Sequence, residues 1–161
     1  MVGGILKEKI RKQDDIGISG NVEIIVRNEY TGKIIRKERK KNRIPNTGLN
    51  YMRDLIRGEN TNPISHFAVG TDGTSTTEND IDLGNEVYRQ QITRIDVADR
   101  ILTVRYFLSS NEANGEILSE AAILNSDEGG EMLGRVTYTD IEKNENISVT
   151  YIWDINLAYV E

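Results

Sequence analysis

The segment from residue 147 to residue 157 constrains the fold more than any other part of the sequence. Apolar side chains occupy every second position, and all the intervening residues except Ile152 are polar. Strict alternation of this kind indicates a β-strand with one face in a core and the other toward solvent. Antiparallel sheets provide that environment, so we expect an antiparallel β-protein. The apolar positions are Ile147, Val149, Tyr151, Trp153, Ile155 and Leu157.

Shorter segments with strand character precede this one, separated by turns rich in Gly and Asn. Their spacing, without any βαβ alternation, is typical of a β-sandwich. The sequence therefore predicts a mostly-β fold, an antiparallel β-sandwich that is jelly-roll-like. The expected strands cover residues 22–27, 33–41, 65–69, 86–97, 100–108, 117–124 and 132–139.

One short helix is expected between Pro45 and Gly58. Asn46 or Thr47 can cap its first amides. Helical spacing places four apolar residues on one stripe that should pack on a sheet, namely Leu49, Met52, Leu55 and Ile56. We expect two parts: residues 1–45 as an N-terminal arm and basic β-hairpin, with the arm over residues 1–20, and residues 46–161 as the helix plus the β-sandwich domain.

Charge is distributed unevenly along the chain, which has a net charge of −6. Residues 1–57 carry 14 Lys and Arg against 7 Asp and Glu, and the remainder carries 6 against 19. This polarity suits subunits that meet plus to minus, and it suits equally a soluble domain with an uneven surface. The chain has no cysteine and no apolar stretch of the roughly 20 residues that cross a bilayer, so we expect no disulfide and no membrane partner.

Basic residues gather in the expected second strand and just after it. Clustered Lys and Arg can bind phosphates, but no aromatic side chains are interleaved to stack bases, so nucleic acid is the disfavoured partner. A basic strand can instead discourage edge pairing or dock on an acidic neighbour. The predicted docking residues are Arg36, Lys37, Arg39, Lys40, Lys41 and Arg43.

Glu120 is the residue for which the sequence makes a specific structural prediction. It shares a strand face with Leu118, Ala122 and Leu124. A buried carboxylate needs a partner, and the candidates are Arg89 and Arg135. The alternative is that Glu120 points to solvent while Ser119, Ala121 and Ile123 face the core.

The sequence gives little support for a catalytic or metal-binding site. His66, the only histidine, follows Ser65 at the start of a short strand, which is usually a structural position. The acids Asp72, Glu78, Asp80 and Asp82 could hold calcium, but their spacing does not match an EF-hand and a solvated loop is favoured. We expect no catalytic residue, no metal site and no cofactor.

Several segments, taken in order, resemble those of small bacteriophage tail proteins of the tail-fibre and baseplate-associated kind. The resemblance covers most of the chain from about residue 20. It rests on residues 30–32 and 42–49, then 67–74, 83–89 and 117–124, and finally Gly134-Arg135, Lys143 and 153–157.

This resemblance implies a virion structural subunit, often trimeric, that attaches through its N-terminal part. Its partners would be copies of itself and other virion proteins, and it would be made in the bacterial host cytoplasm. The chain stops after the last strand without a fibre shaft or receptor-binding tip, which puts host recognition in doubt. A capsid decoration or head-fibre protein is the alternative. A carbohydrate-binding or hydrolytic β-sandwich, with Glu120, Glu131 and Asp140 as acids, is the third possibility.

Overall fold

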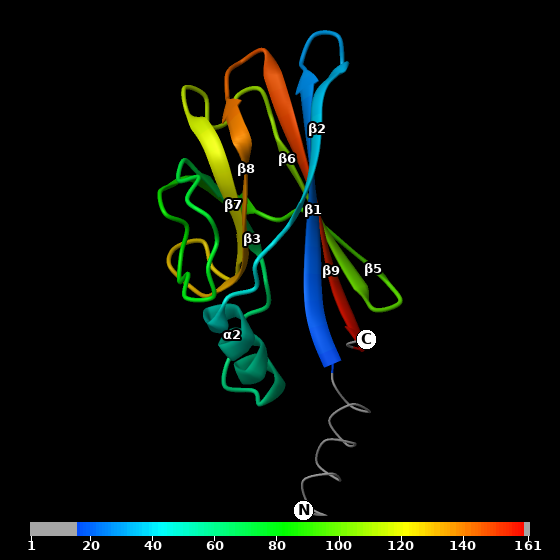
Figure 1. Cartoon of the computed structure of the whole chain (residues 1–161), viewed down its shortest axis with the longest axis vertical. Coiled ribbons are helices and arrows are strands. Elements are labelled where there is room, and N and C mark those ends of the chain that lie inside the picture. The colour runs from blue at the N-terminus through cyan, green and yellow to red at the C-terminus, as the bar shows by residue number, and fades with distance from the viewer. Residues whose placement is uncertain (1–15, 160–161) are drawn as a thin grey trace, which may run out of the picture.

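The computed structural model describes residues 16–159, which form a β-sandwich with one helix in that range (Figure 1). The strand prediction is confirmed for most segments. The elements are β1 (Ile16–Asn28), β2 (Ile34–Lys41), α2 (Asn46–Ile56), β3 (His66–Gly70), β4 (Glu86–Gln91), β5 (Arg94–Ala98), β6 (Ile101–Leu108), β7 (Ile117–Leu124), β8 (Met132–Glu142) and β9 (Ile147–Tyr159).

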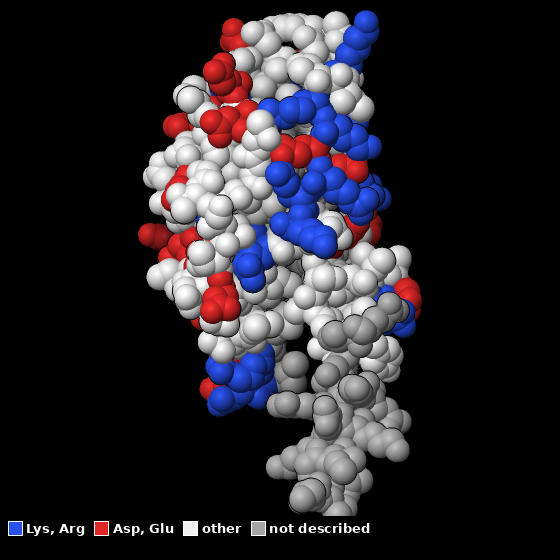
Figure 2. Space-filling view, in the orientation of Figure 1, with Lys and Arg blue, Asp and Glu red and all other residues white. Residues whose placement is uncertain are grey.

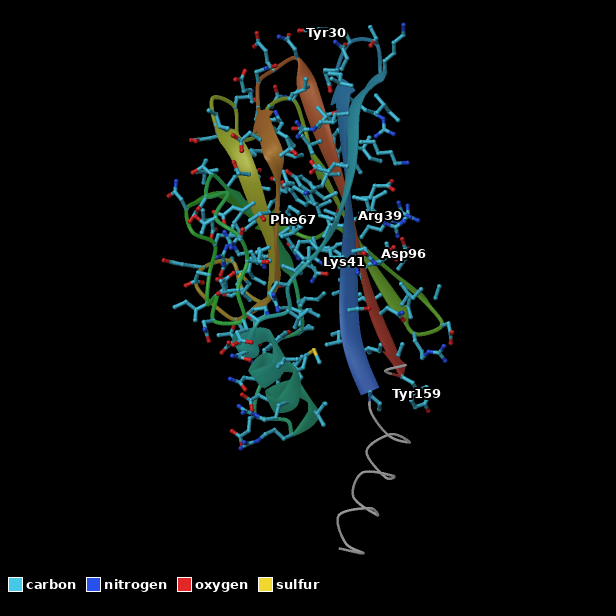
Figure 3. All side chains as sticks on the ribbon, in the orientation of Figure 1. Tyr30, Arg39, Lys41, Phe67, Asp96 and Tyr159 are labelled. Atoms are coloured by element: carbon cyan, nitrogen blue, oxygen red, sulfur yellow. The ribbon has the colours of Figure 1, made fainter. Side chains whose placement is uncertain are left out.

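Two antiparallel sheets pack face to face. The five-stranded sheet has the order β2-β1-β9-β6-β5, and the four-stranded sheet has the order β4-β3-β7-β8. Their facing surfaces bury the alternating residues of β9, including Tyr151 and Trp153. Phe67 of β3 lies between the sheets (Figure 3) and stacks on Tyr106 with ring centroids 4.5 Å apart. Aromatic pairs of this kind contribute about 0.5–1.5 kcal/mol beyond the area that they bury.

The N-terminal hairpin belongs to this sandwich. All thirteen residues of β1 pair with β9, and Val22, Ile24 and Val26 are buried in the shared core. The strand begins at Ile16, within the segment expected to be an arm. The remainder of that expected arm, residues 1–15, lies outside the described residues.

The prediction of a single strand over residues 86–97 is wrong. The chain forms β4 in one sheet and then β5 in the other. Ile92, between them, is partly buried against the core, and its backbone N–H donates to the Ser65 carbonyl at 2.7 Å. Ile92 anchors the chain where it crosses from one sheet to the other. In the sequence, such an apolar residue cannot be distinguished from a position within a strand.

The helix exists where it was expected, and Met52 and Leu55 of its predicted apolar stripe are partly buried against the core, but the other two residues of the stripe are not. Gly48 and Tyr51 are buried, whereas Leu49 is 46% and Ile56 is 87% exposed. A Cβ at Gly48 would collide with the Leu133 carbonyl, so the glycine lets the helix approach β8 closely and this contact sets its rotation. Pro45 occupies the N-cap position, no side chain of residues 16–159 caps the helix, and Thr47 donates its hydroxyl to the Asp80 carbonyl instead.

Strand β7 is buried on both faces. Every residue after Ile117 is buried, and a register shift lies between Leu118 and Glu120. Ala121 and Ile123 belong to the core between the sheets, while Ala122 and Leu124 form a second apolar cluster with Ala68, Leu83 and Met132. Leu83 comes from the loop of residues 71–85, which therefore covers the outer face of the four-stranded sheet.

Candidate docking surfaces and a buried acidic network

Glu120 lies in β7 with its side chain fully buried beneath the 71–85 loop. Its carboxylate accepts four hydrogen bonds. The backbone N–H groups of Asp72 and Asn85 donate to Oε1 at 3.1 and 2.8 Å. The N–H of Gly84 and Nε of Arg135 donate to Oε2, both at 2.9 Å. Both ends of the loop are thereby fixed to one carboxylate.

Arg135 of β8 completes this network. Its Nη1 donates to Oδ2 of Asp80 at 3.0 Å, and its Nη2 donates to the Asp72 carbonyl at 3.1 Å. The structure therefore places Arg135 against Glu120. Arg89 lies elsewhere and pairs with Glu86 at 2.7 Å.

Two glycines make room for the network. A Cβ at Gly70 would overlap Oε1 of Glu120 and the Asn85 carbonyl, and a Cβ at Gly84 would overlap the carboxylate of Asp72. Two features of the sequence are consistent with this network: the two glycines, and the absence of any Lys or Arg between residues 71 and 85. Neither signal identifies Glu120 as the residue that receives the loop.

Asp80 is the acid of this network that remains partly accessible. Burial acts to raise the pKa of its carboxyl, but hydrogen bonds from the backbone and hydroxyl of Thr77 and from Arg135 outweigh burial and leave the pKa lowered. Asp80 therefore stays ionised and balances the guanidinium. Both oxygens of Glu120 already accept hydrogen bonds away from solvent. The role that this arrangement fits is therefore to hold the 71–85 loop in place.

The other residues considered for chemistry are dispersed. Ser65 Oγ lies 2.8 Å from Nδ1 of His66, as adjacent residues allow, and no carboxylate of residues 16–159 hydrogen-bonds this histidine. Asp140 accepts a hydrogen bond from Ser119 at 2.7 Å, whereas Glu131 is exposed at a turn. Within the described range, no group of three or more His, Cys, Asp and Glu side chains could hold a metal ion. In that same range, no helix is long and apolar enough to cross a membrane.

The predicted docking residues divide between two roles. On the inner side of β2, Arg36 donates to the carbonyls of Thr139 and Asp140 at 2.6 and 2.9 Å. Glu38 accepts from the backbone and hydroxyl of Thr139, and Lys40 pairs with Glu38 at 3.3 Å. These contacts tie β2 to β8 across the open side of the sandwich. Arg43 forms backbone hydrogen bonds with Arg135 in both directions.

The outer side of β2 carries Lys37, Arg39 and Lys41, all exposed. Lys37 lies 3.5 Å from Glu23, and the other two have no ion-pair partner in residues 16–159. Figure 2 shows basic side chains concentrated over the β1–β2 hairpin. We call these three residues the basic stripe. Because Arg36 and Glu38 fix the strand from the inner side, the stripe is held on a rigid support.

Acidic side chains are spread over the opposite part of the same face, from the upper ends of β7 and β8 down to the 71–85 loop (Figure 2). Exposed acids of the 71–85 loop, with those of the neighbouring turn, form what we call the acidic patch. The loop also contacts the start of α2, where the N–H of Asn46 donates to the Glu78 carbonyl at 2.8 Å. The molecule thus presents both signs of charge side by side. The acidic patch consists of Glu78, Asp82, Asp127, Glu128 and Glu131.

One buried charge was missed by the sequence reasoning. The side chain of Lys143 is fully buried, and its Nζ donates to Oδ1 of Asn114 at 2.8 Å and to the Asn144 carbonyl at 3.2 Å. Burial lowers the pKa of Lys143, although Glu112 and Glu29 act in the opposite direction. This lysine anchors the turn before β7, and a single lysine in a polar turn gives no sequence signal of burial.

Comparisons with protein-family models, with curated proteins and with solved structures found no match.

Proposed function

We propose that this protein is a structural subunit of a bacteriophage particle, of the tail or baseplate kind, that works by self-association and by docking on other virion proteins. The observation that carries this proposal is the division of one face into the basic stripe and the acidic patch, both on rigid supports. Rigid charged surfaces favour specific docking, because little conformational freedom is lost on contact. The resemblance to tail proteins supplies the class of particle.

The side chains that a carbohydrate-binding or hydrolytic β-sandwich would use are arranged unfavourably for binding or cleaving a sugar. Trp153, the only tryptophan, is fully buried in the core and offers no stacking platform. Glu120 is enclosed by four donors. A capsid decoration or head-fibre protein would use the same surfaces, so location on the particle must separate it from a tail component.

Immunogold labelling of purified particles from the phage that encodes this chain tests the proposal. Label on the tail or baseplate supports it, label on the head supports the capsid alternative, and a particle without label overturns both.

Charge reversal at the docking surface tests the mechanism. Particles assembled without the protein are mixed with the purified protein, and bound protein is quantified after sedimentation. Changing Lys37, Arg39 and Lys41 together to Glu should abolish binding, because the surface would then repel an acidic partner. The matched control changes three arginines outside the stripe to Glu, at Arg53, Arg57 and Arg105, which are also exposed. Equal binding by both triple variants would contradict the assignment of the stripe.

A further inference from the structure

Most free strand edges of the sandwich carry charge. Arg39 lies on the outer edge of β2, Arg94 and Asp96 on β5, and Glu86 on β4. Charges on an edge discourage pairing with another chain. The edge of β8 is covered by Arg36 and Glu38 of β2. In the described part of the chain, these edges are therefore protected against strand addition.

The first three residues of β1, Ile16 to Ile18, form an edge without such protection. They read Ile-Gly-Ile, with no charge and no proline. They pair with β9 on one side, but pairing with β2 begins only at Asn21. The Gly20 carbonyl accepts from Asn42 on the β2 side. Because backbone groups alternate in direction along an antiparallel strand, those of Ile16 and Ile18 point to this open side.

The same end of the five-stranded sheet has an apolar face without a cover from residues 16–159. Ile16 is opposite Tyr159, and Ile18 is opposite Leu157, in the register of β1 with β9. The exposed fractions are 71% for Ile16, 69% for Tyr159 and 47% for Leu157. Figure 1 shows β1 and β9 running past the ends of β7 and β8 here, and Figure 3 shows Tyr159 at this end. A free edge and an exposed apolar face together favour association.

We propose that Ile16–Ile18 pairs with the same segment of a second copy of this chain, antiparallel and about a two-fold axis at Gly17. Ile16 of one copy then exchanges backbone hydrogen bonds with Ile18 of the other, and the two five-stranded sheets become continuous. A second copy is the fitting occupant because the segment is uncharged and meets itself without repulsion, and because a two-fold contact closes both edges at once.

This inference rests on the proposed self-association and specifies one of its contacts. It gives a two-fold contact, unlike the trimer that the family resemblance implies. The apolar side chains of Ile16 and Ile18 become cross-strand neighbours in the joined sheet, which shields them partly from water.

Disulfide trapping tests the pairing directly, since the full chain has no cysteine. Across the proposed axis the two Gly17 residues form a non-hydrogen-bonded pair with a Cα separation of about 4.5 Å, within the range of a disulfide. Under mild oxidation at low protein concentration, Gly17→Cys should form a covalent dimer rapidly. Gly73→Cys is the matched control, because Gly73 is exposed in the loop and a Cβ there meets only Ser119. Cross-linking of Gly17→Cys no faster than this control overturns the proposal.

Analytical ultracentrifugation of the cysteine-free chain gives a second measurement. Ile16→Lys should raise the dimer dissociation constant about tenfold or more, because a charge is placed at the shared edge. Ile81→Lys is the matched control, since Ile81 is 66% exposed in the loop, and it should leave the constant unchanged. An oligomer that persists in Ile16→Lys and does not cross-link at Gly17 refutes this contact while leaving the proposed self-association standing. A wild-type monomer refutes both.

Discussion

Replacing Glu120 by glutamine should destabilise the protein by about 3 kcal/mol. Glutamine keeps the shape of the side chain, but its NH₂ group must face donors where the carboxylate accepted four hydrogen bonds. The Arg135 side chain, 4% exposed, also loses its charged partner at 2.9 Å. Removing one member of a buried ion pair costs about 3–5 kcal/mol. We expect the lower end of that range because Asp80 still contacts Arg135 at 3.0 Å.

Urea unfolding followed by tryptophan fluorescence measures this loss. Trp153 is the only tryptophan and is fully buried, so its emission reports the loss of the core. The matched control is Glu59→Gln, because Glu59 also pairs with an arginine, Arg57, but both side chains are more than half exposed. Such a pair contributes less than about 1 kcal/mol. If Glu120→Gln costs no more than Glu59→Gln, the 71–85 loop does not depend on this network and the reasoning fails.

Two other changes test the same region. Gly70→Ala should destabilise by about 1–3 kcal/mol in urea unfolding, since its Cβ would overlap the Glu120 carboxylate, whereas Gly73→Ala has room and should be nearly neutral. Asp80 has a lowered pKa in the folded state, so its contribution is present above its unfolded pKa of about 4 and is lost as pH falls through the folded value. Asp80→Asn should therefore show a shallower acid loss of stability than wild type, and an unchanged acid profile would contradict the role given to Asp80.

Alternation made the last strand predictable. β9 occupies the middle of the five-stranded sheet, with β1 and β6 as neighbours and the second sheet on one side only. Its burial therefore follows the pattern of its residues, with Val149, Tyr151, Trp153 and Ile155 buried. Strand β6 was predictable for the same reason. A strand whose environment differs only between its two faces can be identified from its own sequence.

Elements whose environment is set by distant residues were predicted less well. The rotation of α2 depends on Gly48 lying against Leu133, a contact that helical spacing does not contain. For Glu120, the sequence indicated a need for an arginine without choosing between two. The register makes the choice, because Arg135 stands opposite Ala122 on the strand next to Glu120, whereas Arg89 lies on β4, two strands from β7.

The run of apolar residues in β7 indicates burial on both faces, whereas the prediction from the sequence considered burial of one face only. A short continuous apolar run is typical of a strand buried on both faces, and β7 has the inner core on one face and the 71–85 loop on the other. Ordering one residue costs about 1–2 kcal/mol, so a loop of this length without strands or helices stays in place only with strong anchors. Leu83 and the Glu120 network are those anchors. Exposed acids such as Glu78 and Asp82 are consequently carried on a backbone that is already fixed, and a docking partner would not have to order it.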